Sequence, residues 1–412
     1  MLDIVALFLV ITALLAYLNH RFVGMPTTIG VMSGALALSL LLIGLNALGI
    51  AGGVLRYEQS LLRSIDFSEL LMQGMLSLLL FAGAMHVDLS ELKQDRWPVI
   101  SLAVLGTLLS TLVVGYGMWL ALPWLGMQVP LIYCLLFGAL ISPTDPIAVM
   151  GILKSAGAPK ELELVIAGES LFNDGVAVVI FSLLLGMLTS GKAPTLGQGF
   201  ELLLQEAGGG LVLGFALGYV TFRLLKSVDN YKVEVLLTLA AVTGGYALAS
   251  ELHVSGPLAM VVAGLMIGNH GRALAMSDTT RRYLDMFWEL LDEILNAVLF
   301  VLIGMEVLLV VFSVSELVAS GLAVIVTLVA RLLTVGLPVR LLRGVFKLPR
   351  GSWKVLTWGG LRGGISVALA LTLPSGTERD TVVALTYCVV VFSILVQGLS
   401  IRHVTRRAVA RG

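Results

Sequence analysis

Five ionisable residues lie inside stretches of sequence that are otherwise strongly apolar: Asp145, Glu169, Asp174, Arg331 and Arg362. Charges in such segments are costly to bury, and they usually mark the route of an ion or a proton. Fully ionised, the three acids and two bases carry a single net negative charge. One monovalent cation or one proton would neutralise that charge, and a one-for-one exchange of the two requires this balance.

Asp145 lies between two helix breakers, Pro143 and Pro146, in the run Ile141-Ser-Pro-Thr-Asp-Pro-Ile147. Proline removes a backbone donor and disrupts the helix around it, so nearby carbonyl groups are freed from helical hydrogen bonds. Hard cations prefer oxygen ligands, and this run offers carboxylate, hydroxyl and carbonyl oxygens together. We therefore expect Thr144 and Asp145 to take part in binding an alkali cation.

A second polar run, Gly168-Glu-Ser-Leu-Phe-Asn-Asp-Gly175, falls in the next apolar segment. A helix turns by about 100° per residue, so Ser170 and Asp174, four positions apart, share one face. By the same geometry Glu169 points roughly 140° away from Asp174. We expect Ser170 and Asp174 to face one cavity. Glu169 should instead pair with an arginine, because an unpaired buried carboxylate tends to take up a proton.

Helices that cross a membrane must position these residues. The sequence is 58% hydrophobic and 13% charged, whereas soluble domains carry about 25% charged residues. Its mean hydropathy is +0.99. Apolar stretches of about 20 residues, long enough to cross a bilayer, recur along the chain. We predict an all-α polytopic membrane protein with about thirteen transmembrane helices, near 3–19, 27–48, 68–86, 98–122, 131–153, 163–188, 205–224, 233–251, 255–269, 287–311, 314–338, 355–373 and 380–400.

The distribution of positive charge supports this count and gives an orientation. With the N-terminus outside, twenty of the 26 Lys and Arg residues fall in segments on the cytoplasmic side and four fall outside. Lys and Arg gather in cytoplasmic loops of membrane proteins, and one helix more or fewer would invert every later loop. We therefore expect a multi-pass protein of the cell (inner) membrane with a cytoplasmic C-terminus. The first helix lacks a basic start and a cleavage site, so we expect it to be retained.

Two of the predicted helices carry breakers at membrane depth. The fifth contains the proline run around Asp145, and the twelfth contains Trp358-Gly-Gly-Leu-Arg-Gly-Gly-Ile365. Interrupted helices in corresponding halves of a transporter indicate its central site. Their spacing predicts two inverted six-helix repeats, about 1–190 and 233–400, joined by a linking helix at about 205–224. The whole chain, 1–412, would then be one transmembrane domain without a soluble regulatory domain.

Three motifs resemble the signatures of a known family, the monovalent cation/proton antiporters. They are Ser142-Pro-Thr-Asp-Pro-Ile-Ala-Val149, Gly168-Glu-Ser-Leu-Phe-Asn-Asp-Gly175 and Gly359-Gly-Leu-Arg-Gly-Gly364. The branch they resemble contains the NhaP-type sodium/proton antiporters and the animal sodium/proton exchangers. The resemblance covers nearly the whole membrane region. It implies a homodimer in membrane lipid, with a mobile six-helix core and an elevator-like movement that exchanges Na⁺ or Li⁺ for H⁺.

The resemblance also implies roles for individual residues. Asn173-Asp174 matches the asparagine-aspartate pair of members that are mostly electroneutral. Asp174 would be the essential carrier, for which Na⁺ and H⁺ compete, and Asp145 would work with it. Thr144, Ser170 and Asn173 would be further cation-binding residues. The ligands of Na⁺ as substrate would be Asp145, Ser170 and Asp174. Glu169 would form a structural ion pair with Arg331 or, as the alternative, with Arg362.

The third predicted helix departs from the family. Some archaeal members carry Phe-Glu-Gly-Gly there, whereas this chain has Phe81-Ala-Gly-Ala84. An acidic group expected near the ion site is therefore missing, and the pH dependence and ion affinity of those members do not transfer. The long cytoplasmic tail of the animal exchangers is missing as well.

Three alternative functions remain to be weighed. Potassium could replace sodium, because oxygen-lined sites for the two ions use the same residue types. A cation channel would need a continuous pore. An enzyme is disfavoured, because Gly168-Glu-Ser170 is not a nucleophile elbow and no histidine lies at membrane depth. No H-E-x-x-H pattern or Cys/His cluster points to a metal cofactor. We expect no cofactor, and no nucleic-acid partner since the chain has no long basic tract.

Overall fold

The computed structural model describes residues 2–48, 74–92, 96–191, 201, 204–308, 313–346 and 348–409, and all regular structure in these ranges is helical. Each of the thirteen predicted segments contains helix, although positions 68–73 of the third segment lie outside the described residues. The helices are α1 (Leu2–Leu18), α2 (Thr27–Ala47), α5 (Leu76–Met85), α6 (Leu89–Leu92), α7 (Arg96–Ser101), α8 (Thr107–Ala121), α9 (Leu131–Ile141), α10 (Ile147–Ser155), α11 (Lys160–Ser190), α13 (Gly209–Leu225), α14 (Tyr231–Glu251), α15 (Gly256–Met266), α16 (Arg272–Leu274), α17 (Asp278–Glu306), α18 (Val314–Arg331), α19 (Leu337–Leu341), α20 (Arg343–Phe346), α21 (Ser352–Trp358), α22 (Gly364–Leu371), α23 (Thr377–Phe392) and α24 (Leu399–Val409).

The helices have the length and surface of membrane spans. Eight helical stretches of the described chain are long and apolar enough to cross a bilayer. Large apolar side chains also project outward, and Val212 and Phe215 on α13 are 71% and 62% exposed. Soluble monomers rarely expose apolar patches of this kind. The eight stretches are Ala6–Val23, Thr27–Asn46, Trp97–Leu125, Lys160–Ser190, Leu204–Leu225, Tyr231–Glu251, Val314–Leu341 and Thr377–Ala408.

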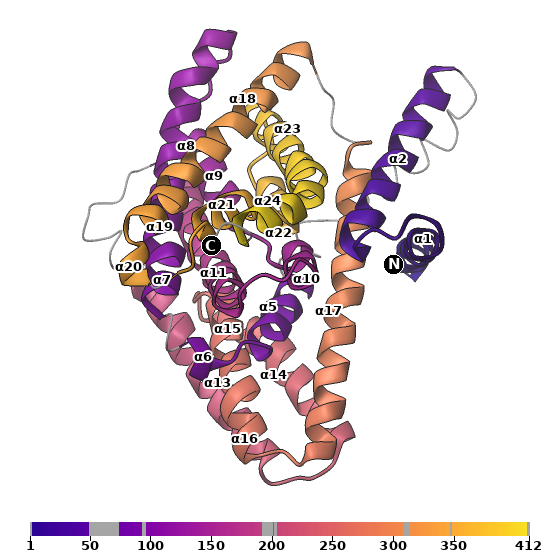
Figure 1. Cartoon of the computed structure of the whole chain (residues 1–412), viewed down its shortest axis with the longest axis vertical. Helices are drawn as coiled ribbons and strands as arrows, with labels where there is room; N and C mark the ends of the chain where they lie inside the picture. The colour runs from indigo at the N-terminus through magenta and orange to yellow at the C-terminus, as the bar shows by residue number, and fades with distance from the viewer. Residues whose placement is uncertain are drawn as a thin grey trace.

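The packing divides most helices into two groups. In what we call the core group, α8 packs on α9 and α18, α9 packs on α11, and α23 packs on α18 and α22. In the flanking group, α15 packs on α5, α13 and α14. The long helix α17 lies against α2 along one side of the molecule (Figure 1) and also contacts α5, α14 and α22. It therefore touches both groups.

The boundaries of α17 correct the sequence prediction. That prediction set the helix at 287–311, in which Asp292 would be the sixth residue. The structure begins α17 at Asp278, where the Ser277 hydroxyl caps the helix by accepting a hydrogen bond from the Thr280 amide at 3.3 Å. Asp292 therefore lies in the middle of the helix. The prediction was wrong because it followed hydropathy, and the first turns of α17 are polar rather than apolar.

Candidate functional site

Both helices that were predicted to break do so, and the two breaks meet. Residues 142–146 separate α9 from α10, and residues 359–363 separate α21 from α22. The Asp145 amide donates a hydrogen bond to the Leu361 carbonyl at 2.8 Å. A Cβ added to Gly363 would lie 2.7 Å from Asp145 Oδ2. Because no side chain fits in that space, glycine is needed for the two unwound segments to approach.

Two buried arginines compensate carbonyl groups at this crossing. Arg362 is only 2% exposed. Its Nη1 donates hydrogen bonds to the carbonyls of Ser142 and Pro143 at 2.5 and 2.9 Å. Arg331 Nε donates to the Leu356 carbonyl at 3.2 Å, in the last turn of α21. The last carbonyls of a helix lack intrahelical partners and carry partial negative charge. Each arginine thus stabilises the carboxyl end of a half-helix.

Glu169 forms its ion pair with Arg331. Arg331 Nη1 lies 2.5 Å from Glu169 Oε1, and Arg331 Nη2 lies 3.0 Å from Oε2. Glu169 and Arg331 are 1% and 6% exposed. The contact is a bidentate charge-assisted pair, which fixes the direction of both side chains. The sequence left two arginines open as the partner of Glu169. The other one, Arg362, instead donates to the carbonyls of Ser142 and Pro143, directly after α9.

Ser170 and Asn173 attach the unwound segment to α11. Asn173 Nδ2 donates to Thr144 Oγ1 at 2.9 Å, and Asn173 Oδ1 accepts from the Thr144 amide at 3.3 Å. The hydroxyls of Thr144 and Ser170 lie 2.9 Å apart. The sequence placed Ser170 and Asp174 on one cavity. In the structure Asp174 lines the cavity, whereas Ser170 is directed to Thr144 and is only 2% exposed.

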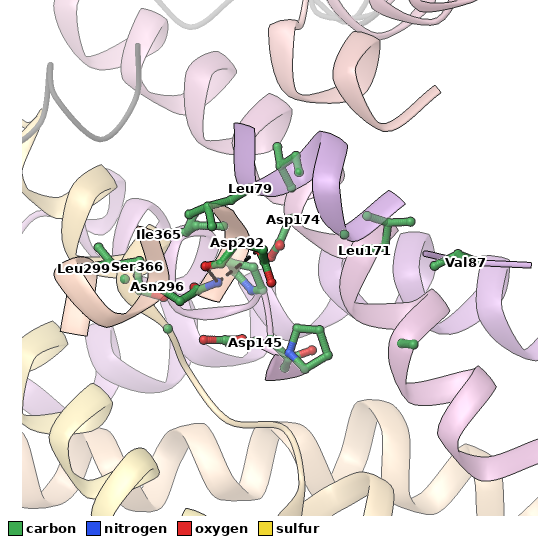
Figure 2. A pocket seen from close by; sticks show the side chains of 18 residues that line it. Leu79, Val87, Asp145, Leu171, Asp174, Asp292, Asn296, Leu299, Ile365 and Ser366 are labelled. Atoms are coloured by element: carbon green, nitrogen blue, oxygen red, sulfur yellow. Dashed lines mark hydrogen bonds between the residues drawn. The ribbon is translucent and has the colours of Figure 1, made fainter. Parts of the chain in front are cut away.

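A cavity of about 130 Å³ opens beside the crossing (Figure 2). Three carboxylates line it: Asp145 from the first break, Asp174 from α11 and Asp292 from α17. Thr144 and Asn296 are also in its wall. Since a water molecule occupies about 30 Å³ of liquid volume, the space accommodates a small cation with a few waters. The cavity therefore has the volume and the oxygen atoms that a small cation would need.

Sequence reasoning missed the acid and the amide that α17 contributes to this wall, Asp292 and Asn296. They are four residues apart on α17, and Asn296 Nδ2 donates to the Asp292 carbonyl at 2.8 Å and to its Oδ1 at 3.1 Å. The spacing of an acid and an amide on one helix face was the available signal. Within the described ranges, no three His, Cys, Asp or Glu side chains converge as ligands of one metal ion. The three carboxylates are therefore spread around the cavity.

The family sequence profile described as "Sodium/hydrogen exchanger, transmembrane" matches residues 9–407. This chain belongs to that family. The match confirms the resemblance carried by the three motifs. The chain is a multi-pass membrane protein of a transporter family, whose description is that of a sodium/hydrogen exchanger.

Relatives of the exchanger family match along most of the chain. It is 57% identical to the Na⁺/H⁺ antiporter NhaP of Pseudomonas aeruginosa over 415 residues, which covers 100% of this chain and 97% of that protein. It is 35% identical to the Na⁺/H⁺ antiporter NhaH of Halobacillus dabanensis over 378 residues, covering 90% and 91% of the two chains.

A solved structure has the same fold. The sodium proton antiporter MjNhaP1 of Methanocaldococcus jannaschii at pH 8 superposes with a TM-score of 0.75 at 20% identity. The alignment covers 98% of this chain and 97% of that one. The all-helical architecture is thus shared across a large sequence distance.

Proposed function

We propose that this chain is a secondary active antiporter that exchanges Na⁺ or Li⁺ for H⁺ across the cell (inner) membrane. One observation carries the proposal: two broken helices cross inside the helical bundle, and Asp145 and Asp174 line one cavity beside the crossing. Discontinuous helices in transporters bind substrate ions in this way. The names of the relatives, Na⁺/H⁺ antiporters of two bacteria, support sodium as the cation.

In this proposal Asp174 holds either a cation or a proton and exchanges one for the other. Asp145 lies where the amino ends of α10 and α22 meet, and this position favours a negative charge. We assign Asp145 the part of a second ligand. Ser170 and Asn173 contribute by holding Thr144 in place. The Glu169–Arg331 pair and Arg362 keep the crossing together.

The remaining features of the proposal concern movement and assembly. We infer an elevator-like movement of the core group, built from two inverted six-helix repeats with a linking helix, in a homodimer surrounded by lipid. The thirteen crossings would place the N-terminus outside and the C-terminus in the cytoplasm. The cavity supports relative movement, because its wall combines residues of the core group with residues of α5 and α17.

The test is transport by the purified protein in proteoliposomes, with Na⁺, Li⁺ and K⁺ each supplied against a pH gradient. Proton flux coupled to Na⁺ and Li⁺ is the expected result. Flux coupled only to K⁺ would make the chain a potassium/proton antiporter of the same fold. Single-channel currents with flux that does not saturate would identify a cation channel.

Protons and sodium should compete for Asp174, because protonation removes the charge that attracts the cation. Below the pH at which the site takes up its proton, the apparent affinity for Na⁺ is expected to weaken about tenfold per pH unit. The measurement is the KM for Na⁺ across a pH series. One-for-one exchange would also leave the rate unchanged when valinomycin and potassium clamp the membrane potential. A rate that varied steeply with the clamped potential would contradict electroneutral exchange.

A further inference from the structure

The helix α17 carries a short polar segment, Asp292 to Asn296, between two apolar contact regions. Its first half packs Leu284 and Trp288 into the cluster of α5 and α15, and the Trp288 ring contacts the Phe81 ring at a tilt of 51°, with ring centroids 4.7 Å apart. Its second half, from Leu299 onward, packs into the other cluster, on α2 and the core group. Asp292 and Asn296 lie between these regions, and both line the cavity. Apolar packing on either side therefore fixes the position of this polar segment.

We propose that Asp292 is a further acidic ligand of the transported cation, supplied by α17 at a position in the cavity apart from Asp145 and Asp174, since the three carboxylates do not converge on one ion in the described residues. The proposal rests on the function proposed above. It assigns to α17 a part in ion selectivity and affinity, in addition to its packing against α2.

The position of Asp292 is the first argument. Asp292 lines the same cavity as Asp145 and Asp174 (Figure 2). Asn296 holds its side chain by donating to Oδ1 at 3.1 Å, and Asn296 is itself 2% exposed. A side chain oriented by a buried neighbour is already in place to bind, so it loses little conformational freedom when a cation arrives.

Charge is the second argument. Among the residues that the structure describes, no Lys, Arg or His forms an ion pair with Asp292. Asp292 is partly buried, and a carboxylate withdrawn from water is stabilised by a nearby positive charge. Asp292 lines the cavity, so a cation bound there would lie close to its carboxylate. A cation in this cavity would supply that charge.

The neighbouring helix α5 gives the third argument. Its residues in the cavity wall are Leu79, Leu80 and Gly83, none of which offers a side-chain oxygen. The run Phe81-Ala-Gly-Ala84 of α5 contains no acidic residue. Asp292 therefore supplies the negative charge on this side of the cavity.

The test is the kinetic effect of Asp292→Asn in proteoliposomes at alkaline pH, where competition by protons is weak. We expect the apparent KM for Na⁺ to rise about tenfold, while the maximal rate stays within about twofold of the wild type. The control is Glu293→Gln, which removes an acid at the next, exposed position of α17 and should leave KM unchanged. A structural role would instead lower the maximal rate or the melting temperature and leave KM unchanged.

Several results would overturn the role of Asp292. An unchanged KM in Asp292→Asn beside an active wild type would do so, as would an equal change in Glu293→Gln. If Asp292→Asn does not fold, Asp292→Glu carries the test, and an unaltered ratio of Na⁺ to Li⁺ affinity would count against the proposal. A wild type without cation-coupled proton flux would overturn the proposed function instead. In that case, calorimetric titration of Na⁺ into the wild type and into Asp292→Asn measures the affinity for Na⁺ without transport, and equal affinities would overturn the role of Asp292 as a ligand.

Discussion

Asp174→Asn is expected to reduce sodium/proton exchange in proteoliposomes to the level of empty vesicles. Asp174 lines the cavity beside the crossing, on a helix whose neighbouring positions hold Thr144 and Arg331. The amide has nearly the same shape as the carboxylate, so packing should be kept. It has no charge to attract a cation and no proton to exchange, so both halves of the cycle are lost. The measurement is uptake of radiolabelled sodium driven by a pH gradient.

Two comparisons make this result specific. Asp380→Asn makes the same chemical change at a side chain that is 73% exposed at the start of α23, and it should exchange at the wild-type rate. Asp145→Asn should retain little exchange and bind Na⁺ more weakly. If Asp174→Asn moved sodium nearly as fast as the wild type, Asp174 would not be the carrier.

Glu169→Ala is expected to destabilise the protein by roughly 3–5 kcal/mol, because it leaves a buried arginine without its counter-charge. The pair it breaks is bidentate, and Glu169 is 1% exposed. Arg331 also holds the last turn of α21 through the Leu356 carbonyl, so its displacement should loosen the crossing as well. The measurement is thermal unfolding of the purified protein in detergent, with and without Na⁺.

The control for stability is Asp380→Ala. It breaks the exposed contact between Arg379 and Asp380, whose charged atoms are 3.8 Å apart, and should cost no more than about 1 kcal/mol. The double variant Glu169→Gln with Arg331→Gln should recover part of the loss, since neither charge is then left alone. A stable but inactive Glu169→Ala would place Glu169 in the ion site rather than in a structural pair.

The charge balance of the site changes once Asp292 is included. The five ionisable residues recognised in the sequence carry one net negative charge, and Asp292 adds a second. One-for-one electroneutral exchange then requires Asp292 to keep the same charge state throughout the cycle. The voltage-clamp measurement described above tests this requirement directly.

The sequence by itself determined the membrane class, the helical segments and the two breaks. These features are local: apolar runs of bilayer length predict helices, and the prolines at 143 and 146 and the glycines around Arg362 interrupt them wherever the helices pack. The three motifs were local as well, and they were sufficient to indicate the family. Hydropathy placed the start of α17 too late, because the first turns of that helix are polar.

Only the tertiary structure decided which groups meet. Glu169 and Arg331 are 162 positions apart, so their pairing depends on the rotation and depth of two helices, which no short-range pattern encodes. The same holds for Ser170, which binds Thr144 across 26 positions rather than facing the cavity. Asp292 entered the cavity wall because packing on both sides of it fixes the rotation of α17. Periodicity gives the relative directions of side chains within one helix, but the contacts between helices decide what those side chains face.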